Sequence, residues 1–134
     1  MLNAKLLGSV RPARSVIPAM IRQQGDSIMF ITGRGGTVPP PKHMPGSCAN
    51  ASLNLLAQGL ATEYGQHGIR VNGLAPDPIQ SPRLEAMKNG VANQVGIGRS
   101  GSPGRCGGGS EFLTSTQARR ITGVCLPVDG GRAK

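Results

Sequence analysis

Three short runs rich in apolar residues, separated by stretches long enough to hold helices, constrain the fold of this chain of 134 residues more than any other feature. They span residues 28–31, 69–74 and 124–128. The first run is continuously apolar, which is typical of a strand buried on both faces of a parallel sheet. The third run alternates and contains Pro127, which places it at a sheet edge. The runs therefore predict an α/β fold with a short parallel sheet of three strands and flanking helices.

Apolar residues between these runs recur with helical spacing. Pro12 suits the first turn of the first helix, whereas Pro18 should kink or interrupt it. Gly65 and Gly68 are stop signals for the second helix. The glycine-rich segment 98–109 predicts only a weak helix, because each glycine costs about 1 kcal/mol relative to alanine. The first stripe comprises Ala13, Val16, Ile17, Met20 and Ile21, and the second comprises Leu53, Leu56, Leu60 and Tyr64.

Composition and charge limit the possible partners and compartments. The net charge is +9, but the basic residues are scattered and only 2 Phe and 1 Tyr could stack on bases, so we do not expect specific nucleic-acid binding. No apolar run is long enough to cross a membrane. The three cysteines and two histidines lack metal-ligand spacing, so no metal site is expected. Reduced cysteines indicate the cytoplasm, with a basic, acid-free start as the argument for the mitochondrial alternative.

A glycine-rich loop follows the first run at residues 32–36. A dinucleotide-binding loop opens directly into a helix, whose amino terminus holds the pyrophosphate. Here three prolines follow at 39–41 and prevent a helix from starting at once. We therefore do not expect this loop to cradle a phosphate.

Several segments, in order along the chain, match a known family. Residues 60–72 are similar to its helix-to-strand segment ending in GIRVN, 75–81 to its PG-x-I-x-T turn, and 98–103 to GR-x-G-x-P. Residues 112–115 and 121–131 are similar to FL-x-S and ITG-x-x-x-x-VDGG. Together they make the chain resemble the second half of the short-chain dehydrogenases/reductases, such as the 3-oxoacyl-reductase-like members. The resemblance implies a Rossmann-like three-layer fragment, with residues 1–134 as a single truncated domain lacking the amino-terminal dinucleotide-binding half.

The resemblance also shows which catalytic side chains are replaced. The family's substrate-orienting serine falls on Gly33, its acid/base tyrosine on Gly46 and its lysine on Asn50, while the asparagine of the preceding helix falls near Lys5. Hydride transfer to a carbonyl needs a proton donor within hydrogen-bond reach, and glycine has none. We therefore expect no catalytic residue at these degenerate positions.

Cofactor contacts are implied at four residues, which are Asn50, Pro76, Ile79 and Ser81. Asn50 can bond a ribose hydroxyl, Ile79 matches a backbone contact to the nicotinamide, and Ser81 retains a hydroxyl where the family has threonine. Asp77 replaces a glycine and disfavours nearby phosphates. The resemblance therefore implies NAD(P) as cofactor, with weak or absent binding.

The leading interpretation is thus an NAD(P)-dependent oxidoreductase by kinship that is inactive as it stands. In the family the two long helices form a dimer interface, which implies a homo-oligomer or a complex with a chain supplying the missing half. The alternatives are an active oxidoreductase using Lys42, Ser47 or Cys48 as proton donor, a non-enzymatic basic binding or oligomerisation module, and a gene remnant that hardly folds.

Overall fold

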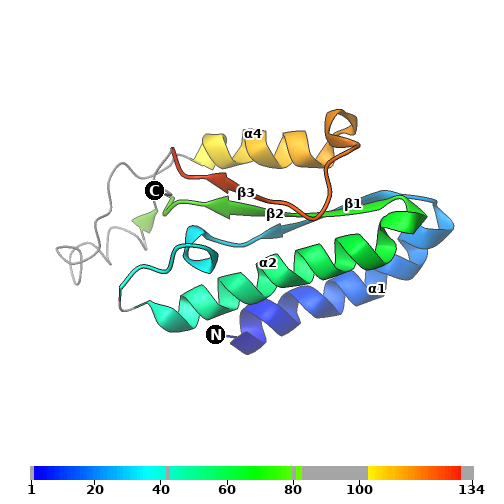
Figure 1. Ribbon diagram of the computed structural model, residues 1–134. Helices are drawn as coiled ribbons and strands as arrows, with labels where there is room; N and C mark the ends of the chain where they lie inside the picture. Colours follow the sequence, from blue (N-terminus) through cyan, green and yellow to red (C-terminus); the bar gives the residue numbers. More distant parts are fainter. Residues whose placement is uncertain (1, 42, 80, 83–102, 131–134) are drawn as a thin grey trace.

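The computed structural model describes residues 2–41, 43–79, 81–82 and 103–130 (Figure 1). A π-helical turn, Asn3–Leu7, leads into α1, Gly8–Arg22, which is followed by strand β1, Asp26–Ile31. A short 3-10 turn at Arg34–Gly36 precedes α2, Met44–Tyr64, and then β2, Ile69–Pro76. Helix α4, Pro103–Thr114, and strand β3, Cys125–Val128, complete the described elements.

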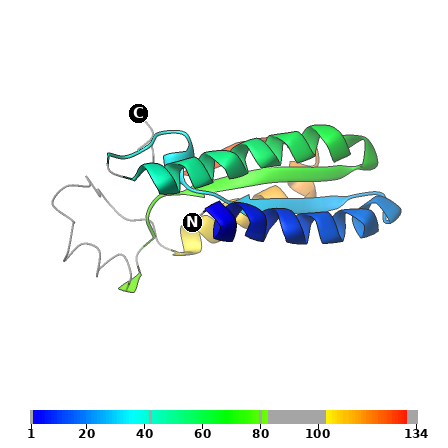
Figure 2. The same cartoon turned by 90° about the horizontal axis from the view of Figure 1, so that it is seen from below.

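The three strands form one parallel sheet in the order β1-β2-β3, as the sequence predicts. Helices α1 and α2 lie side by side on one face of the sheet and α4 covers the other face (Figures 1 and 2). The predicted α/β fold, a Rossmann-like three-layer arrangement, is confirmed. The edge position predicted for the strand with Pro127 is also confirmed, because β3 pairs only with β2 among the described strands.

An aliphatic core holds the two helices against the sheet. Three small residues of α2, Ala49, Ala57 and Ala61, are buried, so the helix can approach the strands closely. β2 is the most buried strand, since its neighbours cover both edges and helices cover both faces. The core cluster comprises Ala13, Ile17, Met20, Phe30, Ala57, Ala61, Ile69 and Val71.

Three expectations for the amino-terminal part were wrong in whole or in part. Pro12 lies inside α1 instead of in its first turn, because the helical segment already begins at Asn3. The helix is not interrupted at Pro18, since the buried Ile17 and Met20 hold this stretch against the sheet. Burial on both faces of β1 was also wrong: Phe30 is buried, but Ile31 is 51% exposed, because β1 is an edge strand of the described sheet.

Helix α4 is better formed than its glycines predict. It runs from Pro103 to Thr114 through three consecutive glycines, while residues 98–102 of the predicted weak helix lie outside the described residues. A Cβ added to Gly109 would lie 3.0 Å from Leu74 Cδ1 and 3.3 Å from Val128 Cγ2, so glycine lets the helix rest directly on the sheet. The buried Leu113 anchors the helix one turn later.

Candidate functional site

The candidate site lies where β1 and β2 end at the same edge of the sheet. Thr32 follows β1 and is tied to β2, since its N–H donates to the Leu74 carbonyl at 2.8 Å and its hydroxyl to the same oxygen at 3.2 Å. In open α/β sheets, ligands bind outside the carboxyl ends of the strands. The residues that follow Thr32 and β2 are therefore the ones to consider.

The glycine-rich loop after Thr32 packs against polar side chains of α2. A Cβ added to Gly33 would lie 2.8 Å from Asn50 Nδ2, one at Gly35 2.9 Å from Ser47 Oγ, and one at Gly36 2.7 Å from Asn54 Nδ2. The glycines thus permit close approach of the loop to the helix. The three α2 side chains are buried, so the loop and the helix form one polar layer.

Gly46 lies buried in the first turns of α2, and its neighbour His43 occupies the space beside it. A Cβ at Gly46 would lie only 2.2 Å from Nε2 of the exposed His43 ring. At both Gly33 and Gly46 a neighbouring side chain therefore fills the volume in which a side chain would begin. Neither position offers a hydroxyl.

Asn50 meets Lys5 directly. The Lys5 ammonium, in the π-helical turn before α1, donates to Asn50 Oδ1 and, at 3.1 Å, to the Thr32 carbonyl. Burial lowers the pKa of Lys5, because desolvation disfavours the charged form. The sequence placed both residues at family positions but did not predict their contact. The available signal was that, by the resemblance, the family's asparagine falls near Lys5 and its lysine on Asn50.

The turn after β2 carries the remaining predicted site residues. Pro76 ends the strand, Ile79 and Ser81 are half-buried, and Asp77 is 5% exposed with its N–H donating to the Val128 carbonyl at 3.2 Å. They share the sheet edge with Gly33, Asn50 and Lys5, which lie close to one another.

The three alternative proton donors named from the sequence differ in their surroundings. Lys42 lies outside the described residues, Cys48 is exposed, and Ser47 is buried with its hydroxyl lacking a hydrogen-bond partner among the described residues. Within the described ranges, no group of three His, Cys, Asp or Glu side chains could hold a metal ion. No helix in the described part of the chain is long and apolar enough to span a membrane.

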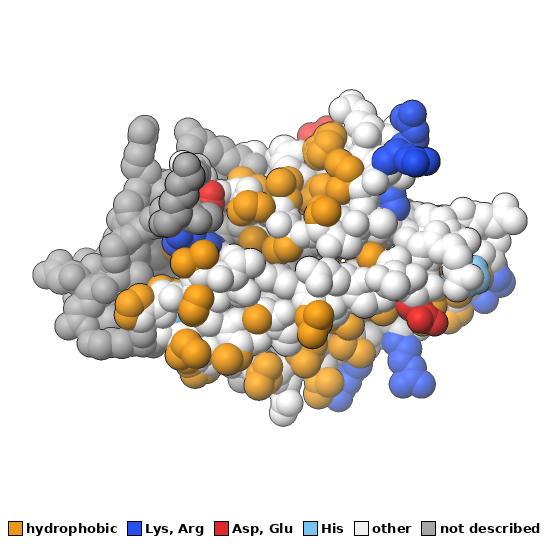
Figure 3. Space-filling view, viewed as in Figure 1, with side chains coloured by type: hydrophobic (Ala, Val, Ile, Leu, Met, Phe, Trp, Pro, Cys, Tyr) orange, Lys and Arg blue, Asp and Glu red, His pale blue; other side chains and the backbone are white. Residues whose placement is uncertain are grey.

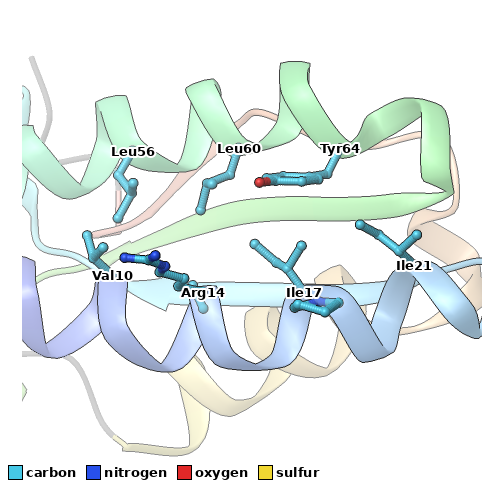
Figure 4. Close-up of a pocket in the computed structure, with 9 residues that line it drawn as sticks. Val10, Arg14, Ile17, Ile21, Leu56, Leu60 and Tyr64 are labelled. Atoms are coloured by element: carbon cyan, nitrogen blue, oxygen red, sulfur yellow. The ribbon is translucent and has the colours of Figure 1, made fainter.

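A second feature is an apolar groove of about 460 Å³ between α1 and α2. Figure 4 shows side chains of the two helices pointing toward one another across it. Apolar side chains gather over α1 and α2 in the space-filling view (Figure 3). The lining includes Val10, Ile17 and Ile21 of α1 and Leu56, Leu60 and Tyr64 of α2.

Known proteins resemble the whole chain. A family model described as enoyl-(acyl carrier protein) reductase matches residues 1–133. The 3-oxoacyl-acyl-carrier-protein reductase of Chlamydia muridarum is 32% identical over 132 residues, which cover 95% of this chain and 53% of that protein. Dehydrogenase/reductase SDR family member 4 of Sus scrofa is 31% identical over 138 residues, covering 98% of this chain and 50% of that protein.

Solved structures agree with the fold. A gluconate 5-dehydrogenase from Burkholderia cenocepacia, in complex with NADP and tartrate, matches with a TM-score of 0.83 and 25% identity, covering 92% of this chain and 51% of that one. The chain spans about half the length of the curated relatives that it matches.

Proposed function

Because the chain belongs to the short-chain dehydrogenase/reductase family, we propose that it forms the nicotinamide-binding half of an NAD(P)-dependent oxidoreductase fold and does not itself catalyse proton transfer. The observation that carries the proposal is the pair of glycines, Gly33 and Gly46, at the edge of the sheet. NAD(P) would supply the hydride, but the carbonyl oxygen that receives it also needs a proton. These two positions have no side chain to deliver one.

The surroundings of these glycines also support the proposal that the chain does not catalyse proton transfer. Asn50 and His43 occupy the volumes beside Gly33 and Gly46. The chain's only phenol, Tyr64, lines the groove between α1 and α2 instead of this edge. The Ser47 hydroxyl, one candidate substitute, is 4% exposed and enclosed by the loop at Gly35.

The residues present fit one end of the cofactor better than the other. The Lys5 ammonium and the Asn50 amide are donors suited to ribose hydroxyls at the carboxyl ends of β1 and β2. The buried Asp77 carboxylate would repel phosphates close to the end of β2. We therefore propose weak binding, carried by the nicotinamide ribose.

Two measurements test the proposal on the intact chain. NADH and NADPH titrations, followed by the fluorescence of the reduced nicotinamide, should show saturable binding, and a ketone panel with NADH should show no oxidation above the protein-free rate. Absence of any binding would overturn the cofactor assignment. Turnover would overturn the assignment of inactivity, and its loss in Ser47→Ala or Cys48→Ala would identify the donor.

The groove between α1 and α2 favours a second role in self-association. Side chains at positions 10, 14, 17 and 21 of α1 and 56, 60 and 64 of α2 follow one face of each helix. We propose that a second copy covers this face, since a two-fold axis would pair the stripe with itself.

Sedimentation of a matched pair of α1 variants tests self-association. Val10→Asp places a charge in the half-buried lining of the groove and should shift the chain toward monomer, whereas Ser15→Asp changes an exposed position of the same helix and should not. A wild-type chain that sediments as a stable monomer at all concentrations contradicts the proposal. Association unaffected by Val10→Asp would instead direct attention to the exposed edge of β1 and a chain that extends the sheet there.

A further inference from the structure

The Lys5 ammonium joins three segments that are distant in sequence. It reaches from the π-helical turn Asn3–Leu7 to the Thr32 carbonyl after β1 and to the Asn50 amide on α2. The partners are 27 and 45 residues away. The position is therefore defined by the tertiary fold at the carboxyl edge of the sheet, where a ligand would sit.

The local hydrogen bonding leaves capacity for a ligand. An ammonium group has three N–H donors, and two are directed to the oxygens of Thr32 and Asn50. Among the described residues no acceptor takes the third donor, which suits an oxygen acceptor. The Asn50 amide nitrogen adds a second kind of donor next to it.

Within the described residues, the partners of the Lys5 ammonium are neutral oxygens. No carboxylate of the described residues lies within 4.0 Å of it, and the Arg34–Asp129 ion pair does not include it. A half-buried cation without a counter-ion is stabilised by any ligand that brings hydroxyl or anionic oxygens to it.

We propose that Lys5 supplies the cation of the cofactor site and that Lys5 and Asn50 have exchanged the roles of the family's lysine and asparagine. The ammonium enters from the segment before α1 instead of from α2. It lies one hydrogen bond beyond the Asn50 amide. Lys5 and Asn50 together bind the vicinal hydroxyls of the nicotinamide ribose. This inference rests on the proposed function, since it presupposes that the chain binds NAD(P).

A reciprocal exchange of the two residues is the decisive experiment. Dissociation constants are measured by fluorescence for NADH and for reduced nicotinamide mononucleotide, which contains the nicotinamide ribose without the adenosine half. Lys5→Asn should weaken both by about tenfold or more, the effect expected for losing a hydrogen bond to a charged group. Asn50→Lys should also weaken both, because it sets two ammonium groups against each other. The double variant Lys5→Asn/Asn50→Lys should return to within about threefold of the wild type.

Controls separate this effect from charge loss and from misfolding. Arg11→Asn removes one positive charge from an exposed position of α1 and should leave both dissociation constants unchanged. Circular dichroism melts verify folding, and Lys5→Met, which keeps the apolar stem, replaces Lys5→Asn if the latter unfolds. As an independent readout, the oxidised mononucleotide at saturation should slow acetylation of Lys5, quantified by mass spectrometry.

The binding results distinguish failure of the proposed exchange from failure of the proposed function. If Lys5→Asn binds as tightly as the wild type, or the double variant is as weak as the worse single variant, the exchange is overturned while the proposed function stands. If the wild-type chain binds neither the mononucleotide nor NADH, both are overturned.

Discussion

Replacement of Asn72 by alanine tests how the strands that carry the candidate site are held together. Asn72 lies in β2 and is completely buried. Its amide nitrogen donates to the Ile121 carbonyl at 3.0 Å, and its amide oxygen accepts from the Val124 N–H at 3.2 Å. One side chain thereby fixes the segment leading into β3.

The magnitude follows from these two bonds and the loss of packing. Each hydrogen bond contributes about 0.5–1.5 kcal/mol, and the two backbone groups left behind in partly buried positions cost more where water does not reach them. We expect Asn72→Ala to lower the free energy of unfolding by about 2–3 kcal/mol. For a chain of this length that corresponds to a decrease in Tm of about 7–10 °C.

Urea unfolding and thermal melts measure the change, with Gln66→Ala as control. Gln66 also donates an amide N–H to a backbone carbonyl, that of Glu63 at 3.3 Å, but it is exposed, so its loss should change stability by less than about 0.5 kcal/mol. Asn72→Asp separates the two bonds, since the carboxylate still accepts from Val124 but repels the Ile121 carbonyl. A loss below about 1 kcal/mol for Asn72→Ala, or one equal to the control, refutes the reasoning.

Three further predictions concern α4 and Lys5. Gly107→Ala should stabilise the chain by up to about 1 kcal/mol, because the added Cβ meets open space. Gly109→Ala should destabilise it, because the added Cβ would press on Leu74. Thermal melts of the two variants test this difference. Arg70→Met should speed amide exchange at the end of α4 and lower stability by about 1–3 kcal/mol, because the guanidinium donates to three carbonyls there at 2.7–3.2 Å; unchanged exchange would contradict this. The pKa of Lys5 in the folded chain is lowered from its ordinary value of 10.5, so at pH values between the two the unfolded chain binds more protons. The free energy of unfolding, relative to that of Lys5→Met, should therefore rise with pH across this window. Urea titrations that show a fall would refute this.

Local patterns in the sequence predicted the elements whose residues cooperate over short distances. The second helix was found because its leucines repeat every three to four residues, and β1 because its apolar run, residues 28–31, is continuous. Both signals need no knowledge of the rest of the chain. The same local reasoning failed at Pro18 and at the glycines of α4. In these places contacts with the sheet outweigh the intrinsic preference of the residue.

The candidate site shows the same division between local and distant information. Gly33, Gly46 and Asn50 could be placed from spacing along the chain, and that reasoning predicted the loss of the proton-donating hydroxyls. The Lys5 contact could not be placed in this way, because 45 residues separate it from Asn50. The sequence indicated this contact only through the residue types at positions 5 and 50. That indication could be interpreted once the structure showed that the two side chains touch.

The geometry around Gly33 argues that these substitutions depend on one another. Because a Cβ at Gly33 would lie 2.8 Å from Asn50 Nδ2, a serine there requires the Asn50 amide to move, and its bond to Lys5 would have to move with it. A glycine at 33 therefore accommodates the asparagine at 50, and that asparagine in turn receives the ammonium of Lys5. Restoring the family's serine alone would disturb the pair that we assign to the cofactor before it supplied any chemistry. On the proposed assignment, the three positions would have to be exchanged as a group, because residues in contact do not act independently.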